Sequence, residues 1–210
     1  MTVVQGVDED RKDLPAAALG SAKKEQEKLT DDLRREARQA YYASISFMDA
    51  QVGKVVEALD RLGLFENTII VFTSDHGYHL GEHGLWQKMS LFEESARVPL
   101  LIVAPGVKPG VVPAPVSHVD LFPTLAHMCG IQAPENLQGQ NLTPLLQDPT
   151  RPGRNWALTQ VSRGGGARQA AVSTNVAAEG TFFLGYSLRT PRWRYTEWDH
   201  GQRGRELYDH

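Results

Sequence analysis

The sequence predicts an α/β fold, in which a mixed or parallel sheet is flanked by helices and followed by a small C-terminal antiparallel sheet. Three observations predict it. Apolar residues recur every three or four positions over 30–62, which is typical of one face of a helix. Two short, nearly continuous apolar runs, 68–73 and 98–104, are typical of strands buried on both faces of a parallel sheet. After Trp156, short aromatic and β-branched runs alternate with turn residues.

The chain divides into three predicted segments. Residues 1–29 are polar and contain a cluster of Lys and Glu, which predicts a solvated loop or a short exposed helix. Residues 30–156 carry the α/β pattern, and residues 157–210 form part of the antiparallel subdomain. The long helix is expected to begin after Thr30 as N-cap and to end at Gly63.

Shorter elements complete the prediction. A short helical segment is expected over 91–97, a helix capped by Ser117 or Asp120 is expected to run to Cys129, and another short helix is expected over 142–146. Four strands are expected over 158–161, 182–189, 192–198 and 205–208. Cys129 stands among apolar helix residues, which favours a small buried side chain over a reactive thiol.

Composition excludes some classes of function. The 22 basic and 25 acidic residues give a net charge of −3, so nothing favours nucleic acid or an anionic membrane as partner. A hydrophobic content of 41% and a charged content of 22% are typical of a soluble globular protein. The single cysteine excludes an intrachain disulfide. The sequence has no apolar run long enough for a transmembrane helix, and residues 1–20 do not resemble a signal peptide.

The candidate site follows the first apolar run. Asp75 and His76 stand where this strand ends, and ligand sites of parallel sheets lie beyond the carboxyl ends of the strands. A carboxylate beside an imidazole is a metal-binding pair or an acid/base pair. Lys88 is a mobile cation that could reach an anion in the same crevice. Each residue taken singly has a structural explanation, but their concentration among glycines predicts a site whose chemistry the spacing leaves open.

The string S-D-H-G-x(2)-L-G-E-H-G-x-W-x-K, followed by MSLFEESARVPLLIVAPG, resembles the second half of a sulfatase, within the alkaline-phosphatase-like superfamily. The likeness is strongest to the branch that contains iduronate-2-sulfatase and its bacterial relatives. It implies a partial alkaline-phosphatase-like fold, a divalent cation held by Asp75 and His76, and a contact between Lys88 and the sulfate of a sulfated small molecule or saccharide. The resemblance favours Ca²⁺, whereas ligand chemistry alone also admits Mn²⁺ or Zn²⁺.

The family's nucleophile is not found in this chain. Sulfatases use a formylglycine made from Cys or Ser in a C-x-P-S-R or S-x-P-x-R signature, and Cys129 stands in M-C-G-I-Q. We therefore expect no catalytic nucleophile here, a missing N-terminal half of the same enzyme as partner, and no turnover by the isolated chain. For the full-length protein we expect a soluble periplasmic or secreted enzyme. The alternatives are a phosphate or phosphonate monoester hydrolase of the same superfamily and a non-catalytic, truncated metal-binding protein.

Overall fold

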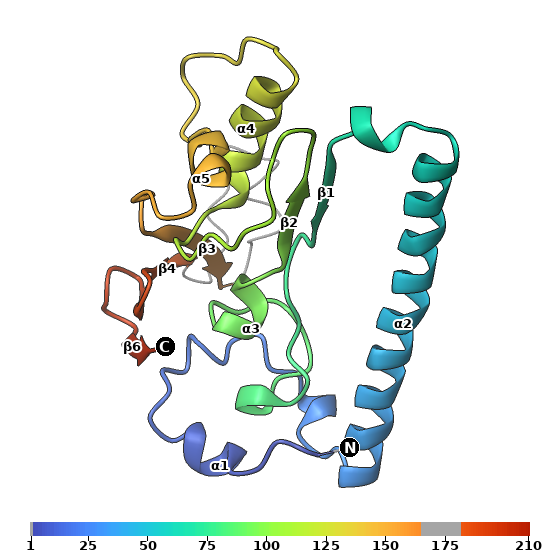
Figure 1. The fold of residues 1–210 in the computed structure, drawn as a ribbon. Coiled ribbons are helices and arrows are strands. Elements are labelled where there is room, and N and C mark those ends of the chain that lie inside the picture. The colour runs from blue at the N-terminus through green and yellow to red at the C-terminus, as the bar shows by residue number, and fades with distance from the viewer. Residues whose placement is uncertain (1, 165–181) are drawn as a thin grey trace, which may run out of the picture. The chain divides into compact units, whose positions relative to one another are not determined.

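A computed structural model describes residues 2–164 and 182–210 (Figure 1). The chain separates into two compact units, residues 1–105 and 106–210. The predicted segment boundaries at 29/30 and 156/157 stay predictions. Within the described part of the chain, no helix combines the length and the apolar character that crossing a membrane requires.

The first unit contains one long helix and several short elements. In chain order they are α1 (Val7–Asp10), the 3₁₀ turn η1 (Lys24–Gln26), α2 (Asp31–Arg61), η2 (Phe65–Asn67), β1 (Ile70–Thr73), η3 (Glu82–Gly84), α3 (Glu93–Ala96) and β2 (Leu100–Val103). Figure 1 shows α2 as the dominant element of this unit.

Helix α2 confirms the predicted helix over 30–62. The Thr30 side chain accepts a hydrogen bond from the Leu33 N–H and so caps the first turn. Gly63, at a φ of +66°, supplies the left-handed backbone that commonly follows a helix. No side chain of α2 is fully buried, and apolar residues such as Phe47 and Val55 are exposed. The periodicity therefore predicted the helix correctly, but it did not determine what covers its apolar face.

Strands β1 and β2 pair antiparallel, with Thr73 opposite Leu100. The expectation that these two strands are parallel-sheet strands buried on both faces is wrong: their pairing is antiparallel, β1 is half-buried, and Leu101 and Val103 of β2 are exposed. An apolar run records which residues avoid water, but not which other elements cover them. Because β1 ends opposite the start of β2, the segment that connects them begins and ends at the same end of the strand pair. This segment carries the candidate site.

The expectation of a solvated segment over residues 1–29 is also wrong in part. Val3 and Ala18 are buried, at 6% and 1% exposure. Asp10 of α1 lies against His83, with 2.8 Å between Oδ2 and Nδ1, and the Gln26 amide donates to the Trp86 carbonyl at 3.4 Å. A few small apolar side chains dispersed among charges show no helical period, so the pattern did not reveal that this segment packs on the loop after β1.

The described residues of the second unit, 106–164 and 182–210, form two short helices and a four-stranded sheet. Its elements are the 3₁₀ turn η4 (His118–Asp120), α4 (Leu121–Met128), α5 (Thr143–Gln147), β3 (Ala157–Arg163), β4 (Phe183–Arg189), β5 (Trp193–Trp198) and β6 (Arg205–Asp209). The strands pair antiparallel in the order β3-β4-β5-β6, which confirms the predicted C-terminal antiparallel sheet.

A fully buried carboxylate organises the helical part of this unit. Asp120, at 0% exposure, accepts hydrogen bonds from the backbone N–H of Ser117 and of Gln140, at 2.8 and 2.9 Å. The Arg154 guanidinium contacts both of its oxygens, at 3.1 and 3.0 Å. The capping role predicted for this region is therefore confirmed, and Asp120 also joins the loop before α5 to the segment before β3.

One face of the sheet is buried and polar. Ser187, Thr196 and Glu206 are successive partners across β4, β5 and β6, and all three are buried. The Thr196 and Arg194 side chains donate to the Ser187 hydroxyl, at 2.8 and 2.9 Å. Burial raises the pKa of Glu206 to about 7, and the Trp198 side chain opposes part of this shift.

Cys129 is exposed, so the expectation of a buried side chain is wrong. The residue is the C-cap of α4, after the last helical residue Met128. The buried side chains of the helix are Thr124 and Ala126. Because the helix stops at Met128, the following residue lies beyond the packed turn, although its neighbours in sequence are apolar.

Candidate metal and anion site

Asp75 and His76 begin the loop that follows β1. The Ser74 hydroxyl donates to the His76 carbonyl at 2.7 Å, and the His76 backbone N–H donates to Asp75 Oδ1 at 3.1 Å. These local bonds turn the chain sharply out of the strand. The two functional side chains therefore lie just beyond Thr73, at the end of β1 where the sequence places them.

Gly77 allows this loop to approach the segment around α3. Its N–H donates to the Ser95 carbonyl at 2.8 Å. A Cβ at this position would collide with the Glu94 carbonyl group. The glycine is therefore required by close packing, since any side chain would push α3 away from the site loop.

Three side chains converge at the strand end. Lys88 Nζ lies 2.6 Å from His76 Nε2, and Asp75 Oδ2 lies 3.4 Å from the same nitrogen. The Asp75 side chain is 84% exposed and the His76 side chain 33% exposed, so a ligand can reach both. The structure thus brings together the three residues singled out in the sequence, and their roles in binding stay predictions.

The partners of His76 determine which of its ring nitrogens carries the proton. Nδ1 lies 2.8 Å from the Gly77 carbonyl, which can only accept a hydrogen bond. Nε2 faces the Lys88 ammonium, which can only donate. A ring with its proton on Nδ1 satisfies both contacts, and its Nε2 lone pair then faces the Lys88 ammonium. This is the arrangement in which a backbone carbonyl orients a metal-binding imidazole.

The pair of donors fits a part of a cation site. A carboxylate oxygen and an imidazole nitrogen 3.4 Å apart can both contact one ion at metal–ligand distances of about 2.0–2.6 Å. Within residues 2–164 and 182–210, no cluster contains three or more His, Cys, Asp or Glu side chains suited to a metal. Asp75 and His76 therefore offer two ligands to an ion, and a full coordination shell needs others in addition.

Backbone hydrogen bonds fold residues 77–90 into a narrow loop. The N–H of His79 donates to the Gln87 carbonyl at 3.0 Å, and the N–H of Gly81 donates to the Leu85 carbonyl at 2.9 Å. The Tyr78 hydroxyl donates to the Trp86 carbonyl at 2.8 Å. This ladder returns the chain toward its start, which explains how Lys88 meets His76 although 12 positions separate them.

The side chains of Glu82 and His83 stabilise the loop and are not part of the group formed by Asp75, His76 and Lys88. The His83 ring stacks on Phe92 at 3.9 Å between ring centroids, and its Nε2 lies 3.8 Å from Glu94 Oε2. Glu82 accepts from the Leu80 N–H, at 2.6 Å, and faces Arg38 of α2. The sequence pattern did not predict these contacts, because Arg38 belongs to a distant helix and the spacings from His83 to Phe92 and Glu94 match no regular helix or strand period.

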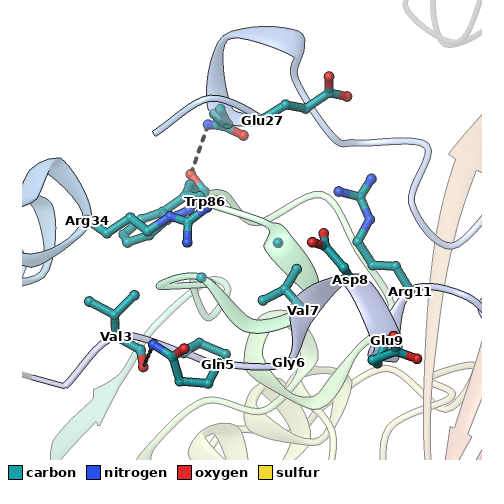
Figure 2. A pocket seen from close by; sticks show the side chains of 14 residues that line it. Val3, Gln5, Gly6, Val7, Asp8, Glu9, Arg11, Glu27, Arg34 and Trp86 are labelled. Carbon is teal, nitrogen blue, oxygen red and sulfur yellow. Dashed lines mark hydrogen bonds between the residues drawn. The ribbon is translucent and has the colours of Figure 1, made fainter. Parts of the chain in front are cut away.

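A cavity of about 580 Å³ lies in the first unit beside this loop. Figure 2 shows that side chains of both charges line it, among them Asp8, Arg11 and Arg34, with Trp86 on its wall. Asp75, His76 and Lys88 are not among the lining residues. The cavity is therefore separate from the convergent side chains, and its mixed charge indicates no ligand class.

Comparison with known proteins identifies the family. A family model described as Sulfatase matches residues 9–131, more than half of the chain. The chain belongs to the sulfatase family. The sulfatase match includes β1, the whole loop with Asp75, His76 and Lys88, and β2.

Similar sulfatases occur in distant organisms. Choline-sulfatase of Rhizobium meliloti (strain 1021) is 37% identical over 170 residues, which cover 80% of this chain and 30% of that protein. Iduronate 2-sulfatase of Homo sapiens is 35% identical over 214 residues, which cover 80% of this chain and 38% of that protein. The chain therefore spans only about a third of the length of these sulfatases.

The fold is also similar to that of solved structures. The phosphonate monoester hydrolase of Silicibacter pomeroyi superposes with a TM-score of 0.80 at 26% identity, covering 100% of this chain and 43% of that one. The sequence-based expectation of a partial alkaline-phosphatase-like fold is confirmed. A solved 2-O GAG sulfatase superposes with a TM-score of 0.79 at 23% identity, covering 100% of this chain and 45% of that one. A sulfatase and a phosphonate hydrolase therefore share this architecture, and the fold alone does not distinguish between their reactions.

Proposed function

We propose that this chain supplies the metal- and sulfate-binding back portion of a sulfatase that hydrolyses the monoester of a sulfated small molecule or saccharide. The observation that supports it most is the convergence of a carboxylate, an imidazole lone pair and an ammonium at the end of β1. Similarity to choline-sulfatase and iduronate 2-sulfatase favours sulfate esters as the substrate class.

In this proposal Asp75 and His76 bind a divalent cation, with Ca²⁺ favoured by the family. The cation would polarise the sulfate group and stabilise negative charge that develops during ester cleavage. The Gly77 carbonyl holds the His76 ring with Nε2 directed toward the site. Further ligands and the formylglycine nucleophile would come from a front portion of the complete polypeptide.

Lys88 binds the sulfate in this proposal. One lone pair on His76 Nε2 cannot accept a hydrogen bond from Lys88 and bind a cation at the same time. When a cation is bound, the ammonium therefore turns to another acceptor, and an anionic sulfate oxygen is the natural one. If Lys88 is only a solvated surface charge, its ammonium is not expected to move from His76 to a sulfate oxygen.

Metal binding by the chain itself tests the proposal first. Mn²⁺ is titrated into the 210-residue chain while paramagnetic broadening of the His76 ring resonances is followed by NMR, which detects weak binding. We expect saturable broadening that Asp75→Ala removes. Asp60→Ala, which deletes an exposed carboxylate at the end of α2, serves as the control and leaves the broadening unchanged. Equal broadening in both variants contradicts a site at Asp75.

Turnover is tested in the complete polypeptide. We expect hydrolysis of an aryl sulfate there, a loss of about 100-fold or more in kcat/KM with Asp75→Ala because a metal ligand is removed, and no turnover by the chain alone. Turnover by the isolated chain that Asp75→Ala abolishes would contradict the need for a separate nucleophile. Detection of metal binding without turnover of any ester would favour the non-catalytic alternative.

A phosphonate or phosphate monoesterase is the second candidate. The similarity to the phosphonate monoester hydrolase of Silicibacter pomeroyi favours it. An aryl sulfate and an aryl phosphonate monoester compared at equal concentration distinguish the two reactions. A higher kcat/KM for the sulfate supports the first candidate, and the reverse order supports the second. A periplasmic or secreted location stays an expectation.

A further inference from the structure

His79 occupies an unusual position among the residues of the site loop. Its side chain is fully buried, at 0% exposure, while Asp75 and Lys88 nearby are exposed. Burial, followed by the neighbouring His83, lowers the pKa of His79 from 6.5 to about 4. The ring is therefore neutral near neutral pH, and it contributes hydrogen bonds and packing but no charge.

Two bonds from His79 reach the chain on either side of Lys88. The backbone N–H of His79 donates to the Gln87 carbonyl at 3.0 Å. Its ring Nε2 lies 2.7 Å from the Ser90 hydroxyl. A single residue thus fixes the positions immediately before and two after Lys88.

The Ser90 end of this contact continues to the Lys88 backbone. The Ser90 N–H donates to the Lys88 carbonyl at 2.9 Å, and the Ser95 hydroxyl donates to the same carbonyl. The Ser90 hydroxyl also accepts from the Phe92 N–H at 3.3 Å. A displaced Ser90 would therefore lose both its bond to the Lys88 carbonyl and its bond to the Phe92 N–H, and only the Ser95 hydroxyl would still hold that carbonyl.

Aromatic rings fix the orientation of the His79 imidazole. Phe92 lies edge-on to it, with 5.8 Å between centroids and planes at 90°. His83, itself stacked on Phe92, is tilted at 73° with 6.0 Å between centroids. Among the described residues, Nδ1 is buried and meets no hydrogen-bond partner. The Ser90 hydroxyl is therefore the polar partner of Nε2, and Glu82 also interacts with the ring.

We propose that His79 is a positioning residue for Lys88, which it holds against His76 by bonding to both Gln87 and Ser90. This inference rests on the proposed role of Lys88 in binding the sulfate. It assigns to His79 no contact with substrate or cation. Its contribution is to keep the short segment 87–90 in the one arrangement that places the Lys88 ammonium beside His76.

The first test measures, without any enzyme activity, whether His79 holds the segment 87–90 in place; this holding role is called the brace below. His79→Leu introduces an apolar side chain of similar bulk and removes the ring hydrogen bond. His79→Gln introduces an amide that can still form a hydrogen bond with Ser90. Amide hydrogen exchange of the 210-residue chain is followed by NMR. We expect His79→Leu to raise the amide exchange rates of Ser90 and Phe92 about tenfold and to change the rate of Gly77 little. His127→Leu, at an exposed position of α4, is the matched control.

The second test asks whether His79 acts through Lys88. In the complete polypeptide, His79→Leu is expected to lower kcat/KM about 10- to 100-fold, as removal of a supporting residue commonly does. Combined with Lys88→Ala, it is expected to cause no loss beyond that of Lys88→Ala alone. His79→Gln is expected to recover most of the activity and most of the amide protection.

The outcomes separate this inference from the proposed function. Unchanged exchange at Ser90 and Phe92 in a folded His79→Leu chain contradicts the brace, whatever the activity. Independent, multiplying losses from His79→Leu and Lys88→Ala show that His79 does not act through Lys88. Normal activity of Lys88→Ala contradicts the proposed sulfate contact instead, and the exchange measurements then decide on the brace alone. If His79→Leu does not fold, the same measurements on His79→Gln replace it, and loss of protection there contradicts the inference.

Discussion

Lys88→Ala should change cation binding and turnover in opposite directions. In the chain, the Lys88 ammonium donates to His76 Nε2 at 2.6 Å and so competes with a cation for the same lone pair. A charged hydrogen bond at this exposed position contributes about 1 kcal/mol. Repulsion between an ammonium and a divalent ion about 4 Å away in water adds at most about 2 kcal/mol, which a flexible side chain partly avoids.

The net effect on cation affinity is therefore about 1–2 kcal/mol, or about 5- to 30-fold tighter binding. The assay is the Mn²⁺ titration of the chain followed at the His76 resonances. Lys54→Ala removes an exposed lysine of α2 and is expected to leave Kd unchanged. In the complete polypeptide, the same Lys88→Ala should lower kcat/KM by about 10- to 150-fold, because a charge-assisted contact worth about 1.5–3 kcal/mol is lost.

One result would refute this reasoning. If Lys88→Ala leaves Kd for Mn²⁺ within about twofold of that of Lys54→Ala, which corresponds to less than about 0.5 kcal/mol, the ammonium does not compete for Nε2. If it also leaves kcat/KM unchanged, Lys88 is a surface charge and the sulfate is bound by other residues.

Three further predictions concern stability. Gly77→Ala should lower the free energy of unfolding by about 1–3 kcal/mol, because the added carbon overlaps the Glu94 carbonyl. Gly53→Ala, in helix α2, should raise the free energy of unfolding by about 0.5–1 kcal/mol, because no atom lies within 4 Å of the added carbon and alanine favours the helix. Urea unfolding of both variants tests this. Asp120→Ala should cost about 3–5 kcal/mol because it strands the Arg154 guanidinium, and a loss under about 1 kcal/mol in chemical unfolding would contradict that role. The raised pKa of Glu206 means that the folded state holds its proton more tightly, so this stabilisation is complete below about pH 4.5 and is lost as pH rises through about 7. Glu206→Gln should therefore raise Tm relative to the unsubstituted chain at pH 8 and not at pH 4, and an equal difference at both pH values would contradict the shift.

The sequence predicted the parts of the site that are local in the chain. Asp75 and His76 stand at the end of an apolar run, and any strand there places them at its end. Lys88 was singled out as an isolated cation among glycines, and the ladder between His79 and Gln87 explains why it meets His76. The resemblance to sulfatases added the roles, which the pattern alone left open.

The parts that the sequence did not predict depend on contacts between distant segments. Asp10 contacts His83 across 73 positions, and nothing in a polar N-terminal stretch indicates such a partner. Ser95 bonds to the Lys88 backbone, and a serine in a short helix carries no signal for that role. The burial of β1 was predicted incorrectly for a related reason, since an apolar run does not specify what covers it.

The exposed apolar side chains of α2 and β2 affect how the unfolding measurements above should be made. Phe47, Val55 and Leu101 are 70%, 62% and 54% exposed. Environment-sensitive dyes such as anilinonaphthalene sulfonate adsorb to apolar surface, so they should fluoresce with the folded chain and report a high baseline before any melting. Trp198 is completely buried, and its intrinsic emission should instead shift to the red as the chain unfolds. Tryptophan fluorescence is therefore the better signal for comparing variants of this protein.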